Sequence, residues 1–299
     1  MNLKRLVNQS LSAASCRLTG SLYDLALSRF PNLVQIETTN ACNAKCLICT
    51  HRKMRRPVKY MAPNLYKMII DECADQGCGK IHLHNFGEPL LDRNIAEFIR
   101  YAKKKRIKHV QMFSNGSLLG CTEIREVIDA GLDEIKISFD GATKGEFERI
   151  RFPLKFEQVL NNVQELVRIR DQKGARLKVK VACCSTSDKG KTMQILEGIV
   201  DGFSFGKTHN WANQEVGHDR RTNIRKPCSR IWRTFTVLAS GDVALCCLDY
   251  EGEVILGNVM KSSIHDIWLN SRYREMRRYH QTAGQHENRI CSRCTKSFW

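Results

Sequence analysis

Short runs in which apolar and polar residues alternate recur along the first two thirds of the chain, separated by longer stretches with helical spacing. Alternation has the period of a β-strand, whereas apolar residues three and four positions apart mark an amphipathic helix. The alternating runs predict six strands, at 33–39, 81–86, 109–115, 134–140, 176–184 and 202–205. Strands that alternate with helices predict right-handed crossovers and a parallel sheet.

The predicted strands carry polar side chains on one face. Ile135 and Ile137 alternate with Lys136 and Ser138, and the other polar positions include His82, His84, Lys178 and Lys180. Parallel strands that are covered by helices on both faces read as nearly continuous apolar runs. A polar face therefore indicates a barrel with a ligand lumen, and six strands are too few to close an eight-stranded barrel. The sequence predicts an α/β fold, a partial (β/α)6 TIM-like barrel.

The pattern changes after the last of these strands. Residues 206–227 are polar, basic and aperiodic, which predicts a linker. A hairpin pattern follows at 234–247, and Ser263 starts a capping-box pattern for a helix that runs through Met276. The predicted parts are an N-terminal helical segment at 1–32, the barrel at 33–205, the linker at 206–227 and a small C-terminal α+β domain at 228–299.

The N-terminal segment has apolar residues near one helical face, at Leu3, Leu6, Val7, Leu11 and Ala14. We interpret it as a docking helix, with peripheral membrane contact as an alternative. No apolar run approaches the eighteen or so residues of a membrane span, and polar residues interrupt the segment that a signal peptide would need. We expect a cytoplasmic protein.

Composition adds two features, 14 cysteines among 299 residues and a formal net charge of +17. A chain with 42% hydrophobic residues is neither disordered nor collagen-like. Disulfide scaffolds are short chains that lack a core, so cysteines in a chain of this length indicate chemistry.

Three of the cysteines, Cys42, Cys46 and Cys49, follow the first predicted strand at gaps of three and two residues. A [4Fe–4S] cluster needs four ligands, so three thiolates would leave one iron open. That arrangement parallels a catalytic zinc site, in which an open position admits the substrate. A zinc site that borrows a distant fourth ligand is the alternative.

With this motif the sequence resembles the radical S-adenosylmethionine (radical SAM) superfamily over about residues 33–205. The second strand is followed by Gly87-Glu88-Pro89, similar to the family's GEP motif at the methionine amino group. The third and fourth strands end in polar residues where the family binds the cofactor, and an apolar residue lies between the cysteines. The resemblance therefore implies SAM contacts from Ile48, Gly87, Glu88, Pro89, Ser114, Asn115, Ser138 and Asp140.

A second set of cysteines, Cys228, Cys246, Cys291 and Cys294, resembles the SPASM/twitch extension of radical SAM enzymes. Four thiolates would fully ligate an auxiliary [4Fe–4S] cluster, and a structural zinc site is the alternative. The other seven cysteines are expected to be mostly core residues, with Cys247 among those nearest to this chemistry.

The resemblance implies a radical SAM oxidoreductase that acts on a small-molecule substrate, and a sugar or cyclitol hydroxyl is our leading interpretation. The lysines of the inner face offer a site for an anionic group. The rival interpretations are a peptide-modifying maturase and a zinc- and RNA-binding protein without radical chemistry. Basic residues at 52–59 would steer an acidic electron donor, a flavodoxin or ferredoxin, and nucleic-acid binding is an alternative use of the charge.

Overall fold

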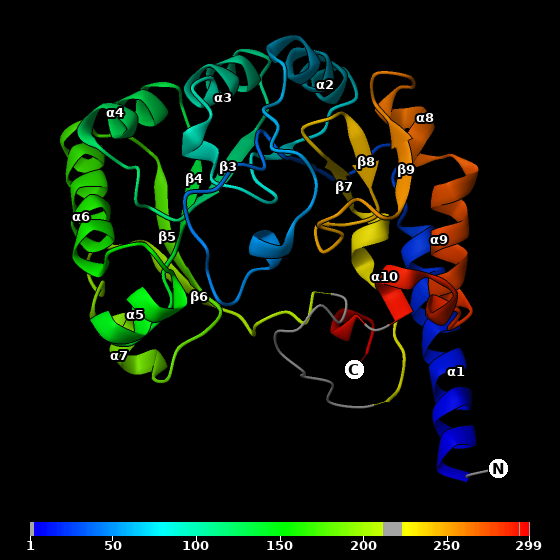
Figure 1. Ribbon diagram of the computed structural model, residues 1–299. Coiled ribbons are helices and arrows are strands. Elements are labelled where there is room, and N and C mark those ends of the chain that lie inside the picture. The colour runs from blue at the N-terminus through cyan, green and yellow to red at the C-terminus, as the bar shows by residue number, and fades with distance from the viewer. Residues whose placement is uncertain (1–2, 212–222, 293, 299) are drawn as a thin grey trace.

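Six parallel strands form a curved sheet in the computed structural model, which describes residues 3–211, 223–292 and 294–298 (Figure 1). They are β1 (Leu33–Ile36), β2 (Lys80–His82), β3 (His109–Ser114), β4 (Glu134–Ser138), β5 (Lys178–Cys183) and β6 (Gly202–Phe205). Each strand pairs with the next one along the chain, so the predicted partial barrel is confirmed. Five of the six lie within the predicted ranges, whereas β2 begins one residue before its predicted range of 81–86, and most of the strands end one or more residues earlier than predicted.

The helices between the strands cover the outer side of the sheet, where α2, α3, α4 and α6 follow one another (Figure 1). The barrel helices are α2 (Pro63–Asp75), α3 (Ile95–Lys104), α4 (Cys121–Asp129), α5 (Lys144–Ile150), α6 (Phe156–Gln172) and α7 (Lys189–Gln194). Outside the barrel are α1 (Leu3–Leu25), α8 (Ile264–Trp268), α9 (Ser271–Gln281) and α10 (Arg289–Ser292).

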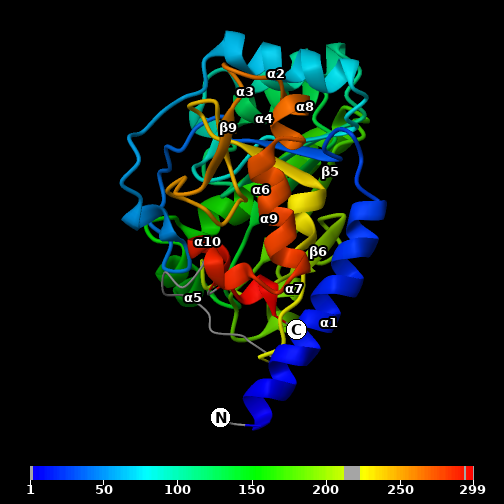
Figure 2. The same ribbon diagram turned by 90° about the vertical axis from the view of Figure 1, so that its right-hand side faces the viewer.

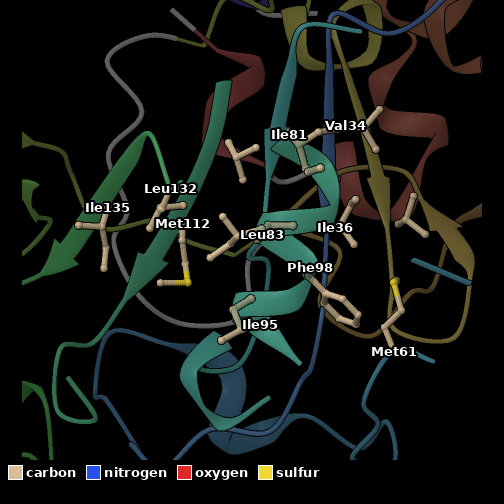
Figure 3. Close-up of a cluster of buried hydrophobic side chains, with 14 of the residues drawn as sticks. Val34, Ile36, Met61, Ile81, Leu83, Ile95, Phe98, Met112, Leu132 and Ile135 are labelled. Carbon is tan, nitrogen blue, oxygen red and sulfur yellow. The ribbon is translucent and has the colours of Figure 1, made fainter. Parts of the chain in front are cut away.

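The core lies between the sheet and these helices (Figure 3). Val34, Ile81 and Ile135 project from the outer face of β1, β2 and β4 and are fully buried. Phe98 of α3 packs among them and is 1% exposed. A fully buried side chain of this size contributes about 1.5–3 kcal/mol. The apolar residues of each alternating run therefore pack against the helices, and the polar face of the sheet lies towards the lumen.

The C-terminal part of the chain extends the same sheet. Strand β7 (Thr234–Val237) pairs in parallel with β1, from Leu33 opposite Thr234 to Ile36 opposite Val237. Two antiparallel strands follow, β8 (Asp242–Ala244) and β9 (Ile255–Asn258). The predicted hairpin is confirmed. The sequence did not indicate that it would join the barrel strands in one nine-stranded sheet.

The single helix predicted from Ser263 through Met276 was wrong, because two helices occupy this stretch. Ser263 caps α8 through a hydrogen bond from Asp266 N, as the capping-box pattern predicts. The chain then leaves the helix at Leu269, and the Asn270 side chain accepts from Tyr273 N at 2.9 Å. Asparagine is a strong N-cap residue, so Asn270 starts a new helix, α9.

Helix α1 docks on α9, but through a different face from the apolar one (Figure 2). Cys16 is buried, and a Cβ on Gly20 would lie 2.7 Å from Gln281 Cγ, so small residues allow the two helices to approach closely. Val7 and Leu11, which lie on the predicted apolar face of the docking helix, are each 48% exposed. Among the described residues, no helix combines the length and the apolar character needed to cross a membrane.

Asp24 joins α1 to the C-terminal part, and Asp24→Ala should lower the free energy of unfolding by about 1–3 kcal/mol. Its carboxylate accepts from Trp232 Nε1 at 2.6 Å and from the Gln281 side chain. Trp232 is 2% exposed, so the substitution would leave a buried indole N–H without this partner. Urea unfolding measures the change. Ser21→Ala, at an exposed position of the same helix, is the control, and an equal loss there would contradict the assignment.

Candidate functional site

The loop with Cys42, Cys46 and Cys49 leaves the carboxyl end of β1 and is held by the segment after α5. Lys45 N donates to Phe152 O at 2.7 Å, and Leu47 N donates to Ile150 O at 2.8 Å. All three cysteines line one central cavity of about 450 Å³. The structure thus brings the three predicted ligands together at the open end of the barrel.

The three thiols lie in surroundings that stabilise sulfur ligands. Burial raises the pKa of Cys42 to about 12 and also raises the pKa of Cys49. Backbone N–H groups donate to both sulfurs, and Arg151 Nη1 lies 3.7 Å from Cys46 Sγ. The Cys42 and Cys49 thiols therefore stay protonated until a metal compensates the thiolate charge, and hydrogen bonds to sulfur tune a cluster. The donor set fits a [4Fe–4S] cluster with three protein ligands.

Gly87 packs directly against the cysteine loop. Its φ of +93° is left-handed, and a Cβ there would lie 2.4 Å from Thr39 O, so no other residue fits. Glu88 N donates to Ala41 O at 2.7 Å, and the Glu88 carboxylate accepts from Ser114 Oγ and from Asn115 N. Burial raises the pKa of Glu88 to about 6. Glu88 therefore joins the ends of β2 and β3 beside the thiols.

Most of the residues that the resemblance assigns to SAM lie on the wall of this cavity. The wall includes Gly87, Glu88, Ser114, Asn115 and Ser138. Three others, Ile48, Pro89 and Asp140, belong to the same loops and strand ends but do not line the cavity. The assignment of SAM contacts to all eight residues remains a prediction.

Asp140 is fully buried and organises the end of β4. It accepts from Cys184 N and Ser185 N, each at 2.6 Å, and from Arg151 Nε at 2.7 Å. This ion pair holds the Arg151 guanidinium between Asp140 and Cys46. The sequence motifs gave no signal for Arg151, which lies just beyond α5.

The inner side of the cavity is lined by polar residues from the strands and from the segment after β2. His82, His84 and Lys136 line it, as the alternating pattern predicts, and Gln111 of β3 lines it as well. Burial lowers the pKa of His82 to about 4 and also lowers the pKa of His84. Both imidazoles are therefore neutral near pH 7. Lys178, which was expected on the same inner face, is exposed and does not line the cavity.

The second set of cysteines surrounds a smaller cavity between the C-terminal strands and α10. Cys228, Cys246, Cys291 and Cys294 all line it, although 66 positions separate the first from the last. Burial raises the pKa of Cys294 to about 11 and raises the pKa values of the other three thiols. Across the described ranges, no group of His, Cys, Asp or Glu is arranged for a single metal ion. Four thiols around a cavity fit a cluster with four protein ligands.

The two cavities adjoin each other, and Arg230 and Leu248 line both. Cys246 faces the smaller cavity, whereas the next residue, Cys247, faces the central one. Arg230 Nη1 donates to Cys247 Sγ at 2.8 Å. A single layer of side chains thus separates the second set of cysteines from the central cavity.

Part of the predicted linker also belongs to the site. His209 and Trp211 line the central cavity, and Trp211 Nε1 donates to Ile48 O at 3.0 Å. The Trp211 ring lies 5.5 Å from the Phe86 ring. Residues 212–222 of the predicted linker lie outside the described residues. An aperiodic stretch carries no signal for these contacts, and the isolated aromatic residue was the only hint.

Comparisons with known proteins match both halves of the chain. The family model of the radical SAM superfamily matches residues 36–171, and that of the SPASM iron–sulfur cluster-binding domain matches residues 228–295. The chain is 21% identical to the S-adenosyl-L-methionine-dependent 2-deoxy-scyllo-inosamine dehydrogenase of Niallia circulans, over 88% of this chain and 92% of that protein.

Two solved structures resemble the whole fold. BtrN in complex with AdoMet and 2-DOIA has a TM-score of 0.63 at 16% identity, covering 88% of this chain and 92% of BtrN. Streptococcus suis SuiB bound to the precursor peptide SuiA has a TM-score of 0.71 at 13% identity, covering 92% of this chain and 72% of SuiB. At these identities the likeness establishes the arrangement of the barrel and the C-terminal domain.

Proposed function

Because this chain belongs to the radical SAM superfamily and carries a SPASM iron–sulfur domain, we propose that it oxidises a hydroxyl group of a sugar or cyclitol. The dehydrogenase that it resembles over most of its length is named for a cyclitol amine. When bound, a reduced [4Fe–4S] cluster at Cys42, Cys46 and Cys49 supplies the electron that splits SAM into methionine and a 5′-deoxyadenosyl radical, and a second cluster supplies an acceptor for a substrate electron.

The observation that carries this proposal is the shared wall of the two cavities. Arg230 and Leu248 line both, so a substrate in the central cavity would lie one side-chain layer from the second set of cysteines. Oxidation of an alcohol removes a hydrogen atom and then an electron and a proton. A site with two adjoining redox centres suits that sequence better than a reaction that returns the hydrogen atom.

The chain's own residues would bind SAM at the carboxyl ends of β2, β3 and β4. Glu88 would pair with the methionine ammonium, with Ser114 and Asn115 holding its carboxylate in place. Ser138 at the end of β4 would contact the ribose or methionine end. Trp211 and Phe86 cover this end of the cavity and would exclude water from the radical.

Glu88→Gln should weaken SAM binding about tenfold or more, because a charged hydrogen bond to an ammonium is replaced by a neutral one. Equilibrium binding of SAM to the reconstituted protein measures the loss. Glu97→Gln, in the exposed Glu97–Arg100 pair of α3, is the matched control and should bind SAM like the wild type. Unchanged SAM affinity in Glu88→Gln would remove Glu88 from the proposed contacts.

The electron for SAM cleavage would come from a flavodoxin or ferredoxin in the cytoplasm. Arg52, Arg55 and Lys59 are exposed beside the cysteine loop, which gives an acidic donor a basic surface. Charge reversal at Arg52 together with Lys59 should slow reduction by the protein donor, while reduction by dithionite stays unchanged. If the protein donor reduced the variant and the wild type at the same rate, the docking surface of the donor would lie elsewhere.

Anaerobic reconstitution followed by turnover tests the proposed function. We expect about eight irons per chain, the content of two [4Fe–4S] clusters. With a panel of cyclitols and sugars, we expect one molecule of 5′-deoxyadenosine for each molecule of ketone. Zinc in the C-terminal site together with no SAM cleavage would contradict the enzyme assignment. A modified peptide, of the kind made from a precursor such as that in the SuiB complex, would contradict the small-molecule substrate.

A further inference from the structure

Four residues form a polar surface on the inner side of the central cavity, which we call the lumen floor: His82, His84, Gln111 and Lys136. They come from β2, β3 and β4 and from the turn after β2. In register, His82 lies opposite Gln111, and Gln111 lies opposite Glu134. Lys136 lies opposite Phe113, two residues further along both strands, so the lumen floor spans three adjacent strands.

Two polar atoms of the lumen floor have no hydrogen-bond partner within the described part of the chain. Gln111 is 4% exposed, and its Nε2 is unpaired. His84 Nδ1 is unpaired as well. Buried amides in folded proteins nearly always have a partner, and an unpaired one destabilises the fold. The acceptor for this side-chain amide must therefore come from the cavity, from water or from a ligand that displaces it.

The lumen floor carries one net positive charge. Glu134 lies between two lysines, 3.3 Å from Lys136 Nζ and 2.7 Å from Lys180 Nζ. Its single carboxylate cannot neutralise both, and of the two ammonium groups only that of Lys136 lines the cavity. His82 and His84 add no charge near pH 7, since their pKa values are lowered. The surface thus offers hydrogen-bond donors and one unit of positive charge.

We propose that the lumen floor binds a carboxylate group of the substrate, through Lys136 Nζ and Gln111 Nε2. A carboxylate carries one negative charge and two acceptor oxygens, which match the single net charge and the two separate donors. A phosphate carries up to two negative charges and three acceptor oxygens. This inference rests on the proposed function and narrows it, because the substrate becomes a polyhydroxylated carboxylic acid such as a sugar acid or a cyclitol acid.

The lumen floor lies nearer the start of the strands than the proposed SAM contacts do. On β3, Gln111 precedes Ser114 by three residues, which is about 10 Å along a strand. On β4, Lys136 precedes Ser138 by two residues. A substrate anchored by its carboxylate at the lumen floor would extend towards the strand ends and present its hydroxyl groups there.

The test is binding of matched acids and neutral compounds to the reconstituted, SAM-loaded protein without reductant. The pairs are glucuronate with glucose and quinate with myo-inositol, and glucose 6-phosphate probes the phosphate alternative. Isothermal titration should show at least one acid binding tenfold or more tighter than its neutral partner. Lys136→Met should reduce that affinity about tenfold or more and leave the neutral compound unaffected. Lys80→Met, an exposed lysine of β2 that does not line the cavity, should change nothing.

The Gln111→Leu variant shows whether the Gln111 amide binds the ligand or only stabilises the fold. If the amide serves the ligand, leucine should weaken binding of the acid without lowering the melting temperature, because an unpaired buried amide is removed. A lower melting temperature with unchanged affinity would overturn the role of Gln111. Neutral partners that bind as tightly as the acids, or tighter binding of glucose 6-phosphate, would overturn the carboxylate assignment. A wild type that binds the acids but does not cleave SAM on reduction would contradict the proposed function alone.

Discussion

Replacing any one of Cys42, Cys46 and Cys49 with alanine should abolish SAM cleavage and lower the iron content from about eight to about four per chain. A cluster with only two protein ligands would not be retained at this site, because the loop offers no further thiol on this side of the central cavity. Cys247 lies across the cavity, beside Arg230. Anaerobic reconstitution, iron analysis and quantification of 5′-deoxyadenosine measure both effects.

Cys121→Ala is the matched control, because Cys121 is exposed at the start of α4 and contacts Glu165 on the outer surface. It should keep both the iron and the cleavage activity. A Cys46→Ala protein that still produced 5′-deoxyadenosine at the wild-type rate would remove the first cysteine set from the reaction. Circular dichroism distinguishes loss of the cluster from loss of the fold.

The double variant Cys228→Ala with Cys246→Ala should separate cleavage of SAM from oxidation of the substrate. We expect iron to fall to about four per chain and 5′-deoxyadenosine to be formed still, whereas the ketone falls at least tenfold. The reason is that the second cysteine set would hold the electron acceptor next to the central cavity. Simultaneous quantification of 5′-deoxyadenosine and ketone measures the ratio.

Cys247→Ala is the neighbouring control for iron content, because Cys247 faces the central cavity and is not one of the four predicted ligands. It should retain about eight irons. If the double variant lost SAM cleavage together with ketone formation, the second site would be a structural element of the fold. Zinc in place of iron at that site would lead to the same conclusion.

The parts of the site that could be predicted from the sequence are those that local patterns determine. Ser138 and Lys136 follow from a strand whose other face is apolar, and the spacing of Cys42, Cys46 and Cys49 is a property of one loop. The convergence of Cys228 with Cys294 came only from the resemblance, because no local pattern links positions so far apart. The start of α9 could have been found, since Asn270 is a residue type that favours N-caps.

The remaining parts depend on contacts between distant segments. Arg151 and Arg230 lie in stretches with no distinctive spacing, and their roles come from the buried sulfur and carboxylate groups around them. Trp211 reaches the cavity from an aperiodic segment. The pairing of β1 with β7 could not be derived, because both edges of a six-stranded sheet are equally available for a further strand.

The pairing of β1 with β7 has a consequence for how the protein is made. Leu33 pairs with Thr234, so the ribosome must add about two hundred residues after β1 before β7 can cover this edge of the sheet. At about 5–20 residues per second, the nascent chain carries an open strand edge for roughly ten to forty seconds. Unpaired strand edges promote aggregation because they can pair with other chains, and contacts between residues so distant in sequence form slowly. The loop with Cys42, Cys46 and Cys49 follows β1 directly, so we expect it to be open to iron–sulfur delivery before the fold is complete.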